Sequence, residues 1–320
     1  MITMKSEYGG YIEFETYNGY EYHPHALALN CGRNALAYLI KRKQIKKIYL
    51  PYFICSSVIE TAIKAGAEVE FYHIGMDLRP INTELEDDCW LYLVNYYGQI
   101  SNDEILKLQN DRLIVDNSQA FFQLPVERID TIYTCRKFFG VADGAYLYTD
   151  TKEDFEEDVS YNRMNFLLGR FEKGPNDFYQ EYVKNNISFK NEPIKSMSKL
   201  THNLLRAIDY SEVSETRRKN FEYLHSVFKD INKLNIRIFP DGAFMYPLYI
   251  TDGSKVRKSL QEKRIYIPTL WPDVLERCSP SDLEYDMAEN ILPLPIDQRY
   301  NLTDMKYIAD EVTKCLNSEN

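Results

Sequence analysis

The sequence predicts an α/β fold: a large domain with a mostly parallel sheet, followed by a smaller α+β domain. Short β-like runs alternate with helical patterns between residues 48 and 115, and strands separated by helices of that length form parallel βαβ units. The stretch 151–235 is polar and helical, and strand and helix patterns alternate again from residue 236. We therefore expect a large domain over residues 1–210 and a small one over residues 211–320.

The expected elements follow from apolar periodicity and from glycine and proline punctuation. In the first half of the chain, strands are expected at residues 11–15, 48–50, 69–72, 90–94, 113–115, 131–133 and 145–149. Helices are expected after the glycine turn at residues 30–34, at residues 55–65 with an end at Gly66, and at residues 102–109. In the second half, we expect helices at residues 155–162, 177–184, 212–228 and 254–262, and strands at residues 244–250 and 265–268. A last helix, capped by Thr303, has an apolar face made of Met305, Ile308, Ala309 and Val312.

Composition argues against several classes of function. The net charge of −10 over 320 residues argues against a nucleic-acid or anionic-membrane partner, because either would need a basic face. No apolar run approaches the roughly 20 residues of a membrane span, and no secretory signal is visible. Six cysteines without a CxxC pair indicate reduced thiols in a cytoplasmic protein. His23 and His25 flank a proline without a third ligand in sight, so we interpret them as loop residues and expect no metal site.

The stretch around Lys137 is the candidate site. Lys137 stands on a tight, aromatic-flanked turn between two strand-like runs, and the run 113–115 delivers Asp116 at the carboxyl end of a strand. In sheets of this kind, ligands bind at the carboxyl ends of the strands. Burial lowers the pKa of a lysine and leaves its amine able to attack a carbonyl group. Considered alone, Lys137 is better explained as a solvated turn lysine, one of 38 lysines and arginines in the chain.

A second candidate lies at the turn Cys31-Gly32-Arg33, which opens a helical pattern. A glycine turn that feeds a helix N-terminus presents free backbone N–H groups and a positive dipole, which suit a phosphate group. Arg33 can add a positive charge. Ordinary helix starts have the same pattern, so this turn is a weak signal by itself.

Together these motifs resemble the DegT/DnrJ/StrS-type aminotransferase family from about Gly10 to Cys315. The motifs are LNCGRNALAYLI at residues 29–40, LIVDNSQAFF at residues 113–122 and TIYTCRKFFGVADGAYLYTD at residues 131–150. The resemblance implies the fold of pyridoxal-phosphate-dependent transferases (aspartate-aminotransferase-like, fold type I), with a seven-stranded, mostly parallel sheet. It also implies pyridoxal 5'-phosphate as the cofactor, because that chemistry needs a lysine, a carboxylate on the ring nitrogen and a phosphate cup.

The resemblance assigns roles residue by residue. Lys137 would form the imine with the cofactor and, once freed, carry the proton between the substrate Cα and the cofactor C4′. Asp116, which lies 21 residues before Lys137, would keep the ring nitrogen protonated. The remaining cofactor-binding positions that the resemblance implies are Gly32, Arg33, Asn34, Cys55, Gln119 and Thr134.

The chain departs from the family pattern at three places. Cys55 stands where an aromatic residue or histidine usually covers the ring, Ile132 stands where the family has serine, and the family's Gly-Glu-Gly-Gly is replaced by residues 142–145, Ala-Asp-Gly-Ala. The phosphate cup is therefore thin. We expect a homodimer in which the partner's polar stretch between residues 174 and 203 completes it. The candidate donors in that stretch are Lys190, Lys195, Lys199 and Asn203.

The implied function is transfer of an amino group from an amino acid, expected to be glutamate, to a keto sugar nucleotide. Such a reaction serves the biosynthesis of cell-surface polysaccharide or lipopolysaccharide. Another pyridoxal phosphate reaction is a second interpretation, although relatives that dehydrate deoxysugars carry histidine in place of Lys137. A non-catalytic protein that binds pyridoxal phosphate or a nucleotide sugar is a third, which Cys55 and the thin phosphate cup favour.

Overall fold

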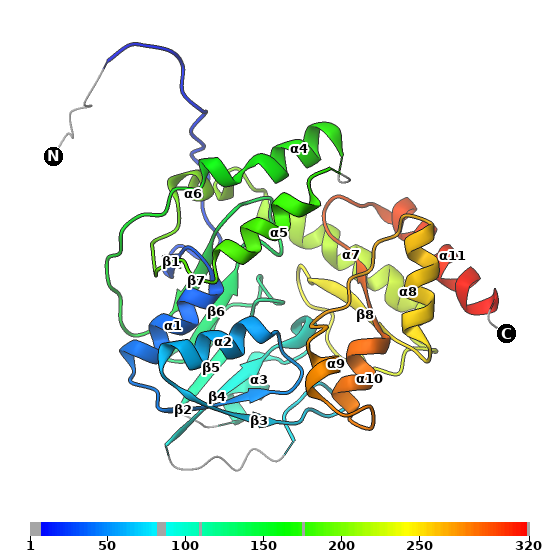
Figure 1. The fold of residues 1–320 in the computed structure, drawn as a ribbon. Helices are drawn as coiled ribbons and strands as arrows, with labels where there is room; N and C mark the ends of the chain where they lie inside the picture. Colours follow the sequence, from blue (N-terminus) through cyan, green and yellow to red (C-terminus); the bar gives the residue numbers. More distant parts are fainter. Residues whose placement is uncertain (1–7, 82–87, 109–110, 175–176, 319–320) are drawn as a thin grey trace.

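The structure, a computed structural model, describes residues 8–81, 88–108, 111–174 and 177–318. A seven-stranded sheet lies at its centre, in the order β1-β7-β6-β5-β4-β2-β3 (Figure 1). Its strands are β1 (Leu27–Leu29), β2 (Lys47–Pro51), β3 (Glu68–Tyr72), β4 (Cys89–Val94), β5 (Leu113–Asp116), β6 (Asp130–Thr134) and β7 (Ala145–Tyr148). Strands β2 to β6 pair in parallel, whereas β7 runs antiparallel to β1 and β6. The predicted seven-stranded, mostly parallel sheet is confirmed.

Helices connect and cover these strands. In this part of the chain they are α1 (Gly32–Arg42), α2 (Ser56–Ala65), η1 (Tyr96–Gly98), α3 (Asn102–Lys107), η2 (Tyr161–Arg163), α4 (Asn165–Lys173), α5 (Tyr179–Ser188) and α6 (Lys199–Leu205). Helix α1 packs on α2, β6 and β7. Helix α2 ends where expected, because Gly66 takes the left-handed conformation with φ 101° that closes a helix. Strands β5 and β6 are buried at every residue, including the polar Asp116 at the end of β5 and Asp130, Thr131 and Thr134 of β6.

The C-terminal part has a two-stranded antiparallel sheet of β8 (Met245–Tyr249) and β9 (Ile291–Pro295). Its helices are α7 (Tyr210–Phe228), α8 (Gly253–Glu262), α9 (Val274–Arg277), α10 (Leu283–Asn290) and α11 (Leu302–Ser318). The predicted apolar face of the last helix is buried at all four positions, Met305, Ile308, Ala309 and Val312. The predicted domain boundary at residue 211 falls at the start of α7, and the boundary itself stays a prediction.

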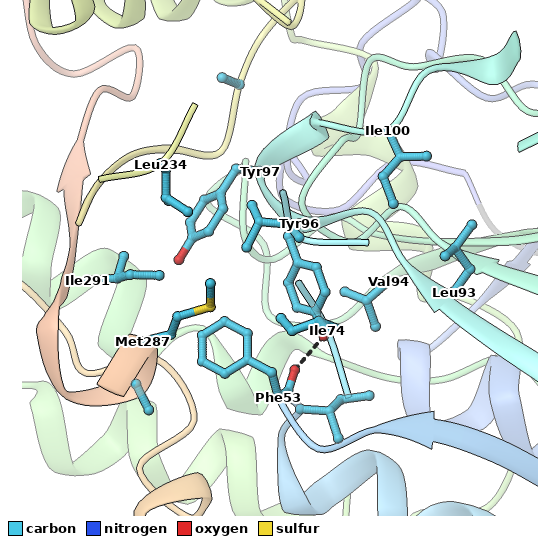
Figure 2. Packing of buried hydrophobic residues seen from close by; sticks show 14 of the residues in the cluster. Phe53, Ile74, Leu93, Val94, Tyr96, Tyr97, Ile100, Leu234, Met287 and Ile291 are labelled. Carbon is cyan, nitrogen blue, oxygen red and sulfur yellow. Dashed lines mark hydrogen bonds between the residues drawn. The ribbon is translucent and has the colours of Figure 1, made fainter. Parts of the chain in front are cut away.

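One apolar core joins the two parts. Figure 2 shows Phe53, which follows β2, and Tyr96 of η1 beside Met287 and Ile291 of the C-terminal part, all buried. Tyr96 donates a 2.6 Å hydrogen bond to the carbonyl oxygen of Phe53. No helix among the described residues is both long enough and apolar enough to cross a membrane.

Several predicted elements are wrong. Residues 11–15 are exposed and pair with no strand, and residues 155–162 form no helix apart from the beginning of the short η2. Residues 265–268 form no strand. Among the described residues, the small sheet consists of β8 and β9. The last helix is capped by Asn301 instead of Thr303, because the Asn301 side chain accepts the first backbone N–H groups. The elements that the sequence patterns did not predict include β1, α4, α6 and β9.

Candidate active site

The carboxyl edge of the sheet brings the predicted catalytic pair together. Asp116 ends β5, in register with Val94 of β4 and Ile132 of β6. Strand β6 ends at Thr134, and the chain then turns through Lys137 before β7 returns. Parallel strands thus place Asp116 and Lys137 on neighbouring loops, as the sequence pattern predicts.

Asp116 is held by two donors and is only 7% exposed. The Tyr92 hydroxyl, on the adjacent strand β4, donates a 3.0 Å hydrogen bond to Oδ2. The backbone N–H of Ser118 donates a 2.8 Å hydrogen bond to Oδ1, which closes a turn within the loop. Burial, together with the charge of Asp116, raises the pKa of Tyr92 well above its ordinary value, so this tyrosine remains a donor at neutral pH.

Lys137 contacts the same loop. Its Nζ donates a 2.9 Å hydrogen bond to Oγ of Ser118 and lies 5.5 Å from the ring centre of Phe244. Burial of the surroundings lowers the pKa of Lys137, while Asp116 and Cys55 act in the opposite direction. The side chain nevertheless remains exposed to solvent. Water therefore still reaches the amine.

The turn that carries Lys137 is fastened to the C-terminal part of the chain. The carbonyl oxygen of Phe138 accepts hydrogen bonds from Gln298 Nε2 at 2.8 Å and from Arg217 Nη2 at 3.3 Å. Arg217 is 1% exposed and also donates to the carbonyl oxygen of Ala243 at 2.9 Å. A buried arginine that bonds several carbonyl groups restricts their movement. The position of Lys137 therefore depends on α7, which the sequence analysis did not connect to the site.

Cys55 lies at the start of α2, half-buried and within electrostatic range of Lys137. Its Sγ is 3.0 Å from Oγ of Ser57. The next backbone N–H, that of Ser56, donates a 3.0 Å hydrogen bond to Asp273 Oδ2 from the C-terminal part. The C-terminal part therefore fixes the loop of Cys55 as well as that of Lys137.

The N-terminus of α1 lies against β6. A Cβ atom on Gly32 would be 3.8 Å from Cγ2 of Ile132, and Cys31 caps the helix with no side-chain hydrogen bond. Arg136 is close enough to Cys31 and Arg33 to interact with both electrostatically, and its buried Nε has no partner among the described residues. Burial lowers the pKa of Arg136, and the neighbouring Arg33 lowers it further. This second guanidinium, directly before Lys137 in the chain, was missed by the sequence analysis.

Three other predicted positions have side chains that form hydrogen bonds with the backbone of neighbouring segments. Arg33 donates a 2.9 Å hydrogen bond to the carbonyl oxygen of Asn186, and Asn34 donates one of 2.7 Å to that of Pro193. Gln119 Oε1 accepts a 2.8 Å hydrogen bond from the backbone N–H of Tyr97, whose φ of 53° is left-handed. These contacts do not test the cofactor roles, which stay predictions. Thr134 is buried at the end of β6 opposite Ala145.

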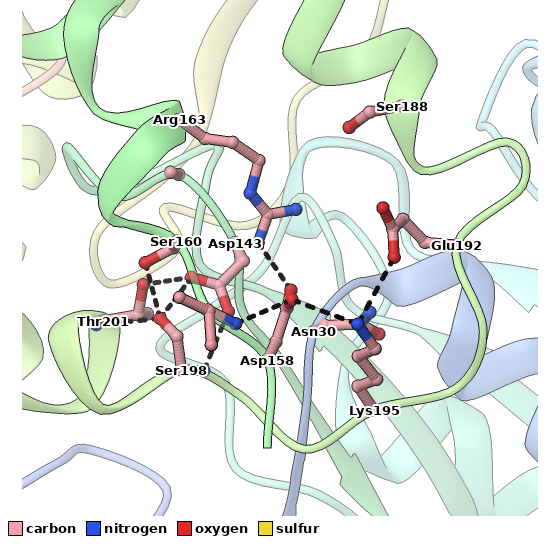
Figure 3. A network of polar contacts seen from close by, with 12 residues as sticks. Asn30, Asp143, Asp158, Ser160, Arg163, Ser188, Glu192, Lys195, Ser198 and Thr201 are labelled. Carbon is pink, nitrogen blue, oxygen red and sulfur yellow. Dashed lines mark hydrogen bonds and ion pairs between the residues drawn. The ribbon is translucent and has the colours of Figure 1, made fainter. Parts of the chain in front are cut away.

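Asp143, within the degenerate glycine motif, has a structural role. Figure 3 shows its carboxylate at the start of α6, where it accepts hydrogen bonds from the backbone N–H of Ser198 at 2.9 Å and from the Ser198 hydroxyl at 2.8 Å. The Thr201 hydroxyl also donates to it. The next residue, Gly144, donates from its backbone N–H to the carbonyl oxygen of Asn30 at 2.7 Å. The segment after Lys137 is thereby joined to the turn before α1.

The residues expected to reach a partner subunit all have contacts within their own chain. Three of them form ion pairs and one holds the N-terminal segment. The pairs are Lys190 with Glu60 at 3.0 Å, Lys195 with Asp158 at 3.9 Å, Lys199 with Glu157 at 3.6 Å, and Asn203 with the carbonyl oxygen of Glu15 at 2.8 Å.

No protein-family model matches the chain, and no curated protein matches it by sequence. Solved structures do match. A DegT DnrJ EryC1 StrS aminotransferase from Brucella abortus is 13% identical, with a TM-score of 0.62, and the match covers 91% of this chain and 85% of that one. PseC of Helicobacter pylori, an aminotransferase involved in the biosynthesis of pseudoaminic acid, is 15% identical, with a TM-score of 0.65 and coverage of 92% and 87%. DesV of S. venezuelae, solved in complex with a ketimine intermediate, is 15% identical, with a TM-score of 0.61 and coverage of 91% and 84%. The chain therefore has the fold of these aminotransferases over nearly its whole length, as the motifs predict.

Proposed function

We propose that this chain, which has the fold of sugar aminotransferases, is a pyridoxal-phosphate-dependent aminotransferase of the DegT/DnrJ/StrS type. It transfers the amino group of an amino acid, glutamate by our proposal, to a keto sugar nucleotide. The observation that carries the proposal is the joining of Asp116 and Lys137 through Ser118 at the carboxyl edge of this sheet. This chemistry requires a carboxylate for the ring nitrogen and an amine for the imine, and the two loops supply one of each.

The residues present fit the cofactor. Asp116 would hold the ring nitrogen, and the free N–H groups at the start of α1 would hold the phosphate. Arg136, whose Nε has no partner among the described residues, interacts electrostatically with Cys31 at this turn, and its positive charge would favour the phosphate. When bound, pyridoxal phosphate would supply an aldehyde that takes up the amino group and a ring that accepts the electron pair released at the substrate Cα.

The protein residues then carry out proton transfer and positioning. Lys137 Nζ would attach the cofactor at rest and, once freed, would accept the proton from the substrate Cα and give it up again. A lowered pKa helps, because it leaves a larger fraction of the amine as free base near neutral pH. Asp116 would keep the ring nitrogen protonated, and Cys55, which interacts electrostatically with Lys137, is the residue proposed to contact the ring.

The acceptor and the setting are proposed from the neighbours and the surface. PseC acts in pseudoaminic acid biosynthesis, which supports a sugar-nucleotide acceptor and a role in cell-surface polysaccharide synthesis. We propose a cytoplasmic homodimer. Helices α4 and α5 support it with apolar side chains that are exposed in the single chain, namely Leu168, Phe171, Tyr179 and Ile187.

A second candidate function is binding of pyridoxal phosphate or a nucleotide sugar without catalysis. Two observations favour it: Ile132 brings a methyl group against Gly32 where the family has a hydroxyl, and Cys55 offers the ring no aromatic face. Addition of pyridoxal phosphate and then glutamate to the purified protein separates the candidates. An aminotransferase turns yellow with the cofactor and bleaches with glutamate, whereas a binding protein turns yellow and stays so. A protein that shows no spectral change with the cofactor contradicts both the aminotransferase and the cofactor-binding protein, and leaves only binding of a nucleotide sugar.

A further inference from the structure

We propose that Ser118 is a positioning residue for Lys137, whose freed amine it holds beside Asp116 while keeping the two groups apart. The proposal rests on the function proposed above. The Lys137 Nζ to Ser118 Oγ hydrogen bond of 2.9 Å is the one hydrogen bond that the amine makes among the described residues. A long, mobile side chain at the centre of the site is therefore fixed by one hydroxyl group.

Ser118 is itself held in place by its neighbours in the loop. Its backbone N–H donates to Asp116 Oδ1 at 2.8 Å. The preceding residue, Asn117, is 1% exposed, and its N–H donates to the carbonyl oxygen of Ile132 at 2.8 Å. The following residue, Gln119, is equally buried and accepts a hydrogen bond from the backbone N–H of Tyr97. The Ser118 hydroxyl therefore occupies a position set in advance, which lowers the entropy cost of orienting the amine.

The chemical type of the contact suits a base that must give and take one proton. A neutral amine that donates one N–H to a hydroxyl oxygen retains its lone pair for the substrate Cα proton. After the proton is taken up, the same oxygen accepts a charge-assisted hydrogen bond from the ammonium group. A carboxylate in this position would stabilise the ammonium form much more strongly and keep the proton on the lysine.

Ser118 also separates the acid from the base. Lys137 and Asp116 interact electrostatically, and a direct ion pair between them would occupy both groups. The backbone N–H of Ser118 binds one oxygen of Asp116, while its hydroxyl binds Lys137. Asp116 thus stays available for the ring nitrogen, and Lys137 stays available for proton transfer.

Two measurements on Ser118→Ala test the proposal, with Ser118→Thr as the variant that restores the hydroxyl. The first uses the cofactor-free protein and measures acetylation of Lys137 by acetic anhydride, with peptide mass mapping. Loss of the acceptor for the ammonium form should leave more free amine, so labelling at neutral pH should be faster by about threefold to tenfold. The second measures the rate at which the cofactor-loaded protein reacts with glutamate in a single turnover. That rate should fall by about tenfold or more, with a larger isotope effect for Cα-deuterated glutamate.

Faster labelling together with slower proton transfer supports the positioning role if Ser118→Thr reverses both and the thermal midpoint of unfolding stays unchanged. General loosening of the fold would lower that midpoint. Ser226→Ala is the matched control, since this exposed serine only bonds the carbonyl oxygen of Tyr223 within α7. Unchanged labelling of Lys137 in Ser118→Ala would overturn the proposal. A slower reaction with glutamate that is accompanied by a lower thermal midpoint would also overturn it. If wild-type protein fails to react with glutamate, the proposed function fails, and the labelling still decides whether Ser118 holds Lys137.

Discussion

Tyr92 donates a 3.0 Å hydrogen bond from the middle of β4 to Oδ2 of Asp116 at the end of β5. The bond lies between buried residues on neighbouring strands, so it fixes which way the carboxylate faces. A second tyrosine extends the arrangement, because the hydroxyl of Tyr72 donates to the carbonyl oxygen of Tyr92 at 2.8 Å. Asp116 is thus held from the sheet through Oδ2, whereas Oδ1 binds the backbone N–H of Ser118, the residue that contacts Lys137.

Tyr92→Phe should weaken cofactor binding by about tenfold or more, because a hydrogen bond to a charged group is worth about 1.5 kcal/mol or more. Titration of the variant with pyridoxal phosphate measures the effect. Tyr72→Phe is the control, since it also removes a buried tyrosine hydroxyl bond but leaves Asp116 untouched. Equal affinities in the two variants would show that Tyr92 does not orient Asp116.

Asp116→Asn should keep the fold and still attach the cofactor to Lys137, yet lose turnover by at least about 100-fold. A neutral amide cannot hold the ring nitrogen protonated, so the electron pair released at the substrate Cα loses its acceptor. The reaction with glutamate alone, followed by absorbance, is the measurement. A rate near that of the wild type would remove Asp116 from the proposed role.

Arg217→Met should destabilise the protein by about 3 kcal/mol, because it leaves buried carbonyl oxygens and Gln298 without their donor. Burial lowers the pKa of Arg217 only to about 10, so the side chain is charged at neutral pH. Urea denaturation gives the free energy of unfolding. The neighbouring Arg218→Met should cost less than about 1 kcal/mol, since Arg218 forms an exposed pair with Glu222. Similar losses in the two variants would refute a special role for Arg217.

His23 should make the protein sensitive to acid. It is buried, with Nε2 2.8 Å from the carbonyl oxygen of Phe121, and burial lowers its pKa to about 4 from an ordinary 6.5. Between these values the unfolded chain binds the proton and the folded chain does not, so stability falls as pH falls through this window. The difference corresponds to about 3 kcal/mol at roughly 1.36 kcal/mol per pKa unit. His23→Gln should flatten this part of the dependence of the unfolding free energy on pH, and an unchanged slope would contradict the assignment.

The sequence predicts the strands of the large sheet better than the segments that connect and cover them. The runs at residues 48–50 and 113–115 become β2 and β5 because buried parallel strands are apolar on both faces. Strand β1 has three residues, too few for a periodic signal. The stretch at residues 155–162 was wrongly predicted as a helix. It is held instead by a β-bridge between Glu157 and Ser196, a residue far away in the sequence. Such contacts leave no trace in local periodicity.

The same limit applies to the site. Asp116 and Lys137 could be predicted as a pair because one strand and one loop separate them in the chain. Ser118 lies between them without a distinguishing pattern, and its contact with Lys137 becomes visible only in the folded chain. Arg217 contacts Phe138 from 79 residues away. The contacts that position Lys137 therefore join residues that are far apart in the sequence, and sequence spacing alone does not reveal them.

Lys137 is the residue that we propose attaches the cofactor. Borohydride reduction of the protein with bound pyridoxal phosphate, followed by peptide mass mapping, identifies the lysine that carries it. We expect the pyridoxyl group on the peptide that contains Lys137, and no label at that peptide in Lys137→Arg, which should remain folded because the side chain is exposed. A pyridoxyl group on a different lysine of the wild-type protein, with Lys137 unmodified, would contradict the account.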